Sequence, residues 1–279
     1  MIVTHSGRFH ADEVFATAMI LMVEEHEIVR SRNPEVINTG DIVLDVGAEY
    51  DPERQRFDHH QNSFTRKRAD GTPFATAGLI WEVFATRILQ SKGLSEPQHI
   101  EYATHWVDEK LIKDVDAVDN GMFMEDPRPS ISMAIGLMNK SADEPKLQLE
   151  AFHKAVSFTS EIMHNIVESA VKEAQVAAEL EAYLSTLEKG ILILDKNLPY
   201  KDFITRHPEV KRVVYPRNDE QYGVYCNGRE NHLPERFRGL RDDELNQISG
   251  LDDMIFCHKS GFMCVSLSLE SALFMAKSQ

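Results

Sequence analysis

The chain opens with MIVTHSGRFHADE, residues 1–13. Its β-branched start is typical of a short buried strand, and the acidic pair Asp12 and Glu13 begins an apolar stretch typical of a helix. His5 and His10 lie in the loop between these two elements. Because imidazole and carboxylate groups are common ligands of divalent cations, the stretch predicts a strand–loop–helix unit that carries a metal site at the end of its strand.

The segments that follow alternate between β-rich and helical patterns. Strands are expected at residues 2–4, 27–32, 41–45 and 56–58, and helices at residues 12–25, 76–90 and 96–118. Strands that alternate with helices form largely parallel sheets. We therefore predict an α/β fold whose N-terminal domain is built on a mostly parallel sheet.

A long helix is predicted next, because apolar residues recur at three- and four-residue steps from Leu147 to Leu187. At 1.5 Å per residue it would extend over about 60 Å, so it is expected to join two lobes or to form a homodimer with a partner chain. Lys189 and Gly190 end it, and new strand patterns follow. The predicted domains are residues 1–189, including this linker helix, and a smaller α/β C-terminal domain, residues 190–279.

Composition limits the function. The formal net charge of −15 disfavours binding to duplex DNA, but it leaves room for phosphorylated substrates if metal ions supply positive charge. The odd number of cysteines, without a Cys-x-x-Cys spacing, argues against a disulfide framework. The longest apolar stretch, residues 14–23, is about half the length that spans a bilayer, and no leader pattern is present. We expect a cytoplasmic protein with no membrane partner.

Four groups of potential ligands fall at predicted strand ends or in the turns beyond them. Each group alone is more often a helix cap or a polar turn. Ligand sites form where the carboxyl ends of parallel strands meet, so all four should converge on one sheet edge. Mixed nitrogen and oxygen donors favour Mn²⁺, Mg²⁺, Fe²⁺ or Zn²⁺, and the number of donors suits two ions about 3.5–4 Å apart. The groups are His5 with His10 and Asp12, then Asp45, then Asp58 with His59 and His60, then Asp116 with Asp119.

These residues carry a family resemblance. Asp58-His59-His60 resembles the signature of the DHH phosphoesterase superfamily, and residues 5–12 resemble its first motif with a histidine, His10, in the middle place. Together with that exchange, further motifs are similar to the melanocyte-proliferating-gene (Myg-type) family, over nearly the whole chain. The motifs are THSGRFHADEVFATAM (4–19), DVGAEYDPERQRFDHHQ (45–61), TAGLIWEVF (76–84), DAVDNG (116–121), FRGLRDDEL (237–245) and CHKSGF (257–262).

The resemblance implies a DHH-type N-terminal domain, a linker helix and a substrate-binding C-terminal lobe. It implies a metal-dependent phosphodiesterase, a 3′–5′ exoribonuclease that uses two divalent ions, Mn²⁺ or Mg²⁺, to activate a water that attacks short RNA or nucleotides. By position, one metal would be held by His5 and His10, Asp45 would bridge, and the second metal would be held by Asp12, His59 and either Asp116 or Asp119. Proton transfer and contact with the scissile phosphate would involve His60, Asp58 and Glu13.

Basic residues and one helix start are candidate substrate contacts, although a surface charge or an intramolecular ion pair is the ordinary reading of each. Arg8 and the run 66–68 could bind phosphate, as could the predicted helix start at Thr76 and Gly78. In the C-terminal lobe, the candidates for backbone contact and base stacking are Arg236, Arg238 and Arg241 with Phe237, and, within the CHKSGF motif, His258 and Lys259.

One departure from the family affects the C-terminal lobe. Relatives tend to have Gly-Gly where this chain has Cys264 and Val265, so two side chains would obstruct a close backbone approach by substrate. Two other functions remain open: a small-phosphate hydrolase of the pyrophosphatase type, and a non-catalytic, metal-stabilised interaction protein.

Overall fold

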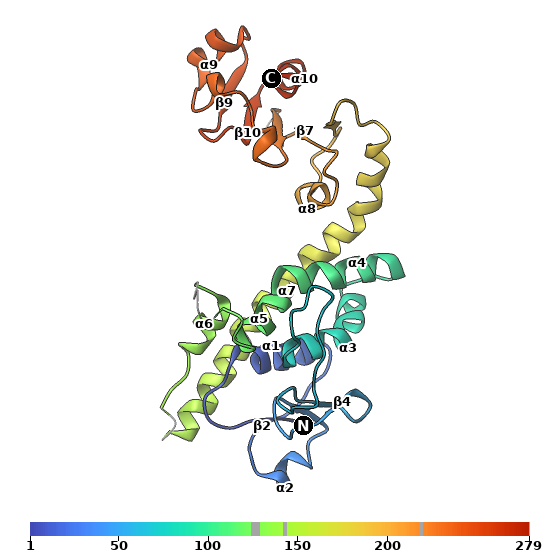
Figure 1. The fold of residues 1–279 in the computed structure, drawn as a ribbon, viewed down its shortest axis with the longest axis vertical. Helices are drawn as coiled ribbons and strands as arrows, with labels where there is room; N and C mark the ends of the chain where they lie inside the picture. The colour runs from blue at the N-terminus through green and yellow to red at the C-terminus, as the bar shows by residue number, and fades with distance from the viewer. Residues whose placement is uncertain (124–128, 142–143, 218–219, 279) are drawn as a thin grey trace. The chain divides into compact units, whose positions relative to one another are not determined.

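The computed structural model describes residues 1–123, 129–141, 144–217 and 220–278. The chain forms two compact units, residues 1–174 and 175–279, and both combine a sheet with helices (Figure 1). The predicted α/β class is therefore confirmed. The division falls within helix α7 (Pro145–Leu184), earlier along the chain than the boundary at residue 190 indicated by the sequence.

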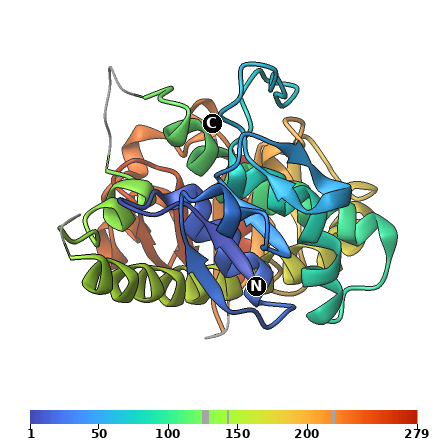
Figure 2. The ribbon, with the colours of Figure 1, turned by 90° about the horizontal axis from the view of Figure 1, so that it is seen from below.

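A mostly parallel sheet forms the centre of the first unit, as predicted (blue strands in Figure 2). Strand β1 pairs in parallel with β2 and β3, and β3 pairs in parallel with β5. The edge strand β4, which was not predicted, runs antiparallel to β5. The order is β2-β1-β3-β5-β4, with bounds β1 Ile2–Thr4, β2 Ile28–Arg30, β3 Ile42–Leu44, β4 Tyr50–Asp51 and β5 Arg56–Phe57.

Both faces of this sheet are buried, which explains the apolar character of its strands. On one face, Ile2, Leu44 and Phe57 belong to the main core with helices α1 (Ala11–Leu21) and α3 (Thr76–Ser91). On the other face, neighbouring strand residues pack around a smaller cluster with helix α2 (Pro34–Ile37). Since the sheet is covered, its carboxyl edge is the place where loops and polar side chains gather.

The helix predicted over 96–118 is interrupted. Helix α4 (Pro97–Val107) leads through a π-helical turn (Asp108–Ile112) into α5 (Lys113–Asp119). A short helix that the sequence analysis missed, α6 (Ile131–Gly136), follows. The first part of α7 contributes Phe152 and Met163, among others, to the main core. Among the described helices, none is both long and apolar enough to cross a membrane.

The second unit has a sheet in the order β6-β7-β8-β10-β9. Only β6 and β7 are parallel, and the remaining pairs are antiparallel. The strands are β6 Ile191–Ile193, β7 Arg212–Pro216, β8 Tyr222–Cys226, β9 Met254–Cys257 and β10 Met263–Ser266, and the α-helices are α8 Lys201–Thr205, α9 Asp242–Ser249 and α10 Leu269–Lys277.

The cysteines of the second unit are free and buried, as expected for packed thiols. Burial raises the pKa of Cys257 to about 11. Cys264 and Val265, in β10, are also buried. Cys264 belongs to the apolar core of this unit, and the effect of this pair on substrate approach stays a prediction.

A glycine near the start of α3 allows α3 and α5 to approach closely. The Gly78 amide donates to Asp116 Oδ1 over 2.9 Å. A Cβ at Gly78 would lie 2.0 Å from Asp116 Oδ2 and 2.8 Å from Phe74 Cδ1. Any side chain here would separate the two helices.

We predict that Gly78→Ala destabilises the protein by about 1–3 kcal/mol, the range for overpacking a close contact. The urea midpoint, followed by circular dichroism, should fall clearly. Gly136→Ala is the matched control, because a Cβ at Gly136 meets nothing within 4 Å and alanine favours a helix by about 1 kcal/mol. Equal midpoints for the two variants would contradict the account of this contact.

Candidate metal centre

Four segments of the first unit meet at the carboxyl edge of its parallel sheet. His5 follows β1, Asp45 follows β3, and His59 and His60 follow shortly after β5. The start of α1 brings His10, Asp12 and Glu13, and the end of α5 brings Asp119. Three overlapping groups result, in each of which the potential ligand atoms lie within 4.8 Å of one another: His5 with His10, Glu13 and Asp45; Asp45 with His59 and His60; His10 with Asp12 and Asp119.

Asp45 occupies the middle of this arrangement. Its Oδ2 lies 3.3 Å from His5 Nε2, and its Oδ1 lies 3.4 Å from His59 Nε2 and from His60 Nδ1. The two carboxylate oxygens thus face different histidines, which is the geometry expected of a bridging ligand. Its backbone is left-handed, with φ of 58°. Aspartate tolerates this conformation better than most residues, and an amide hydrogen bond to Phe57 O of 2.9 Å supports it.

The start of α1 brings Glu13 and His10 to the first ligand group. Glu13 Oε2 accepts the His10 amide over 2.9 Å, which leaves Oε1 facing His5 Nε2 at 2.9 Å. His5 Nδ1 lies 3.2 Å from Ser6 O. With a cation bound, a proton on Nδ1 donated to that carbonyl would leave the Nε2 lone pair for the metal, as in metal-bound histidines. Glu13, expected to handle protons, is therefore placed as a ligand candidate.

Two further carboxylates, those of Asp12 and Asp119, belong to the third ligand group. Asp12 is fully buried, with His59 Nε2 3.8 Å from its Oδ2. The same His59 nitrogen is 3.2 Å from Asp119 Oδ2. Of the two aspartates left open by the sequence, Asp119 faces the centre.

Unpartnered buried atoms indicate that a cation belongs here. His5 Nε2, both Asp12 oxygens, Glu13 Oε1 and His59 Nε2 are buried without a hydrogen-bond partner. Each would cost free energy unless it were paired. A divalent cation would satisfy these nitrogen and oxygen lone pairs together, and hard carboxylate donors mixed with imidazole suit Mn²⁺ or Mg²⁺. The residues therefore fit a divalent-cation site.

The electrostatics reflect the same crowding of carboxylates. Burial, reinforced by Asp45 and Asp119, raises the pKa of Asp12 well above its ordinary value. Burial alone would lower the pKa of His5 and His59, but the neighbouring carboxylates outweigh it and raise both to about 10. Burial would raise the pKa of Asp45, yet the neighbouring His5 and His59 side chains lower it. Without metal, the histidines hold protons that a cation must displace.

Two residues predicted to act in catalysis or substrate binding instead hold ligands in place. Asp58 is buried and accepts hydrogen bonds from the Ala48 amide over 2.6 Å, the His60 amide over 3.0 Å and His60 Nδ1 over 2.8 Å. Thr76 is also buried, and its hydroxyl donates to Asp45 Oδ1 over 3.2 Å. Neither side chain is accessible to a phosphate, so their expected direct roles are corrected to positioning.

A second correction concerns Asp116, Gly78 and the basic run 66–68. Asp116 accepts from Arg68 Nη2 over 2.9 Å and from the Gly78 amide, and it belongs to none of the three ligand groups. Arg68 also binds both oxygens of Asp108 at 2.7 Å, and Arg66 binds both oxygens of Glu82. These ion pairs hold the loop that contains residues 66–68 in place. The Gly78 amide is already hydrogen-bonded to Asp116, so it is not free to bind phosphate.

Arg30, at the end of β2, is a further residue of the site that was not predicted. Its guanidinium lies 3.8 Å from Glu13 Oε1 and 4.5 Å above the Phe152 ring. Burial lowers the pKa of Arg30. The available signal was a basic residue directly after the apolar pair Ile28 and Val29. Arg8, by contrast, is exposed close to the centre, as expected of a phosphate contact.

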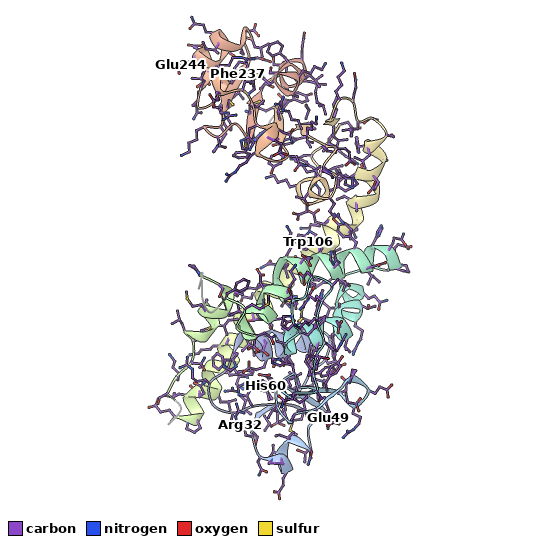
Figure 3. All side chains as sticks on the ribbon, in the orientation of Figure 1. Arg32, Glu49, His60, Trp106, Phe237 and Glu244 are labelled. Carbon is purple, nitrogen blue, oxygen red and sulfur yellow. The ribbon has the colours of Figure 1, made fainter. Side chains whose placement is uncertain are left out.

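In the second unit, the predicted contacts are divided between core and surface. Phe237 (labelled in Figure 3) is buried and cannot stack a base. Arg238 donates from Nε to Leu233 O over 2.7 Å, a structural contact, while Arg236 lies over Phe237 at 4.5 Å. His258 Nδ1 bonds Ser260 Oγ over 2.9 Å, and Lys259 is exposed. These positions do not assign a substrate role.

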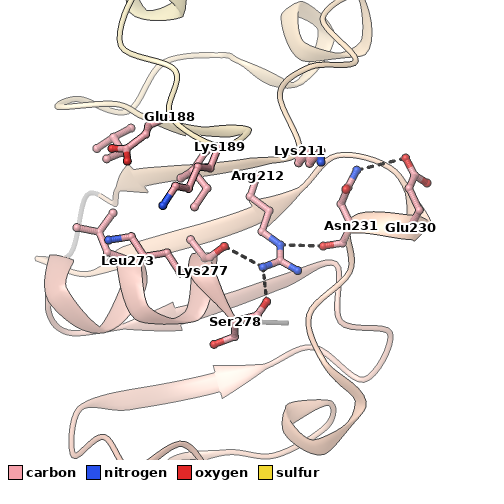
Figure 4. Close-up of a pocket in the computed structure, with 12 residues that line it drawn as sticks. Glu188, Lys189, Lys211, Arg212, Glu230, Asn231, Leu273, Lys277 and Ser278 are labelled. Carbon is pink, nitrogen blue, oxygen red and sulfur yellow. Dashed lines mark hydrogen bonds between the residues drawn. The ribbon is translucent and has the colours of Figure 1, made fainter.

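The second unit also contains a cavity of about 530 Å³ between β6 and α10 (Figure 4). Its Arg212 donates to the backbone carbonyls of Asn231, Ala276 and Ser278. The cavity is lined only by residues of the second unit, and none of the three ligand groups belongs to it. A different cavity, of about 470 Å³, lies beside the candidate metal centre and is lined in part by His10 and His60.

Fold and site together define an α/β protein with a candidate divalent-cation centre at the carboxyl edge of a parallel sheet. A family model described as an uncharacterised protein family (UPF0160), MYG1_exonuc, matches residues 1–279. The chain belongs to this MYG1 exonuclease family. It is 33% identical to the human MYG1 exonuclease, over 98% of this chain and 84% of that protein. It is 32% identical to the Dictyostelium discoideum MYG1 protein, over 99% and 94%.

Two solved structures are similar at a lower level. A pGpG-specific phosphodiesterase, PggH, from Vibrio cholerae is 13% identical, with 97% of this chain and 94% of that chain covered and a TM-score of 0.31. The manganese-bound exonuclease RecJ is 13% identical, with 81% and 78% covered and a TM-score of 0.26. TM-scores this low do not establish a shared fold, so the link to the DHH superfamily stays a prediction.

We predict that Mn²⁺ binds more tightly as the pH rises from 6 to 8. His5 and His59 have raised pKa values and are protonated across this range, so each metal bond must release a proton. Affinity should gain up to about tenfold per pH unit for each proton displaced. Calorimetric titrations in buffers of different ionisation enthalpy measure this release. An apparent enthalpy that is the same in every buffer would contradict the account.

Proposed function

We propose that this protein is a metal-dependent phosphoesterase, and specifically a 3′–5′ exonuclease that hydrolyses short RNA or nucleotide phosphodiesters. The observation that carries the proposal is the convergence of His5, Asp45 and His59 with three further carboxylates on one edge of the sheet. Membership of the MYG1 exonuclease family supports the reaction class. The RNA substrate and the direction of cleavage rest on the family resemblance alone.

The ligand groups divide into two neighbouring sets that share residues. One ion would be held by His5, His10, Glu13 and Asp45, and a second by Asp45 and His59 with Asp12 and Asp119. Divalent cations bound there would supply a low-pKa water and neutralise charge on the non-bridging phosphate oxygens. We favour Mn²⁺ over Mg²⁺, because imidazole suits manganese better.

His60 is the residue best placed to move a proton. Its side chain is 60% exposed, unlike that of His59, and Asp58 fixes Nδ1 through the 2.8 Å hydrogen bond. With Nδ1–H donated to Asp58, Nε2 is free to face the substrate. The hydrogen bond to Asp58 raises the pKa of His60, which favours the imidazolium form at neutral pH. We assign His60 as the acid that protonates the leaving oxygen, with Asp58 orienting it.

A substrate panel tests the proposed function. With Mn²⁺, the purified protein should shorten an oligoribonucleotide labelled at its 5′ end one nucleotide at a time, and it should cleave a dinucleotide. Pyrophosphate should be a poor substrate. Preferential hydrolysis of pyrophosphate would favour the small-phosphate reading. If none of these substrates is hydrolysed, a non-catalytic, metal-stabilised interaction protein would be favoured. Removal of nucleotides from the 5′ end would contradict the proposed 3′–5′ direction of cleavage.

We predict that Asp45→Ala lowers kcat/KM by at least about 10³-fold, because it removes the carboxylate whose two oxygens face His5 in one set of ligands and His59 in the other. Bound metal, measured by elemental analysis, should fall, while circular dichroism stays native. The matched control is Asp114→Ala, an exposed carboxylate on α5. Near-normal turnover by the Asp45 variant would rule out a bridging role.

The acid role of His60 predicts a dependence on the leaving group. His60→Ala should slow cleavage of an RNA dinucleotide by about 10²–10⁴-fold, the usual contribution of a positioned acid. A p-nitrophenyl phosphodiester should lose far less, because its leaving group departs without a proton. Equal losses on both substrates would mean that His60 binds the phosphate and does not protonate it.

A further inference from the structure

A cavity of about 470 Å³ adjoins the metal centre within the first unit. His10, His60 and Asp119 form the wall that it shares with the centre. The rest of its lining comes from the loop before α1 and the first residue of that helix, from α5 and Phe123 beyond it, and from α6 with its cap residue Ser130. A cavity of this size is within the range of small-molecule sites, about 300–1,000 Å³, and any molecule held by the metal centre would lie at its mouth.

The lining combines apolar surface with one cation. Val115 and Val118 of α5 form part of the wall, and Phe123 and Met133 lie exposed at 38% and 52%. Exposed apolar side chains that form a contiguous patch rimmed by polar residues mark ligand-binding grooves or interaction surfaces. Arg8 contributes the positive charge. The surface therefore suits a flat, apolar group attached to an anion.

A hydroxyl in the same lining lacks a partner. Ser132 Oγ is buried and has no hydrogen-bond partner among the described residues. Its neighbour Ser130 differs, because Ser130 Oγ accepts the Met133 amide over 3.1 Å and caps α6. A buried hydroxyl without a partner is unusual. Rotation of the Ser132 side chain would bring this hydroxyl into the cavity, where a ribose hydroxyl would satisfy it.

We infer that this cavity holds the terminal nucleoside of the substrate, with the base against Phe123 and Met133 and its phosphate between Arg8 and the metal centre. This inference deepens the proposed function and rests on it. The lining offers stacking and apolar contact but few groups that read a base edge. The subsite therefore selects for the presence of a base and discriminates weakly among the four bases.

The experiment compares two ligands that differ only in the base, AMP and ribose 5-phosphate, by calorimetry with Mn²⁺. AMP is expected to bind about tenfold to hundredfold more tightly, the gain typical of one stacked base. The four ribonucleoside monophosphates should agree within about fivefold. Equal affinity for AMP and ribose 5-phosphate would overturn the inference.

Variants of the cavity lining test whether the preference for AMP arises in this cavity. Phe123→Ala combined with Met133→Ala should bring AMP affinity down to about the level of ribose 5-phosphate. Gly136→Leu should do the same by occupying the cavity wall, since Gly136 lines the cavity and has room for a side chain. The control is Leu137→Ala, an exposed apolar residue outside the lining, which should change neither affinity. An unchanged AMP preference in both test variants would overturn the inference.

The exonuclease function and the nucleoside subsite can be contradicted by different results. Tight, base-dependent AMP binding that both test variants abolish supports the subsite even if no phosphodiester is hydrolysed, and that result would remove the proposed function alone. Conversely, Mn²⁺-dependent RNA hydrolysis with no preference for AMP over ribose 5-phosphate would remove the subsite and leave the exonuclease function in place.

Discussion

The first unit is organised by one electrostatic constraint: three carboxylates, Asp12, Glu13 and Asp45, are buried beside one another. Isolated buried carboxylates are costly, and pairing with imidazole offsets only part of that cost. His5 and His59 approach these groups, yet several of the facing atoms keep no hydrogen-bond partner. The arrangement makes physical sense as the receptor for a divalent cation, and the surrounding fold supplies the rigidity that such a receptor needs.

That rigidity comes from contacts behind the ligands. Asp45 is held in a left-handed backbone conformation, and Thr76 and the Phe57 carbonyl fix its oxygens and amide. Asp116 ties α5 to α3 through the Gly78 amide and to the preceding loop through Arg68, and so positions Asp119 at the end of α5. These contacts join segments far apart in the sequence, so a change in any of them would act on the metal centre without touching it.

The sequence predicted the parts of the site that depend on strand ends. Because parallel strands share a carboxyl edge, the positions of His5 and Asp45 followed from two short β-branched runs, and that of His59 from the short strand pattern at Arg56 and Phe57. The π-helical turn and α6 were not predicted, because neither has a periodicity of its own. Asp116 could not be separated from Asp119 by spacing, since only the distant Arg68 and Gly78 decide which of the two turns inward. The same limit applied to Arg66, Arg68 and Phe237, whose types suggested nucleic-acid contacts but whose partners are internal.

The most direct test is anomalous diffraction at the manganese edge from crystals grown with Mn²⁺. The account predicts two peaks in the first unit, one between His5, Glu13 and Asp45 and the other beside His59, with Asp45 contacting both. Manganese bound only elsewhere on the protein, or none in a crystal whose first unit is well ordered, would contradict the claim that the buried carboxylates exist to hold cations.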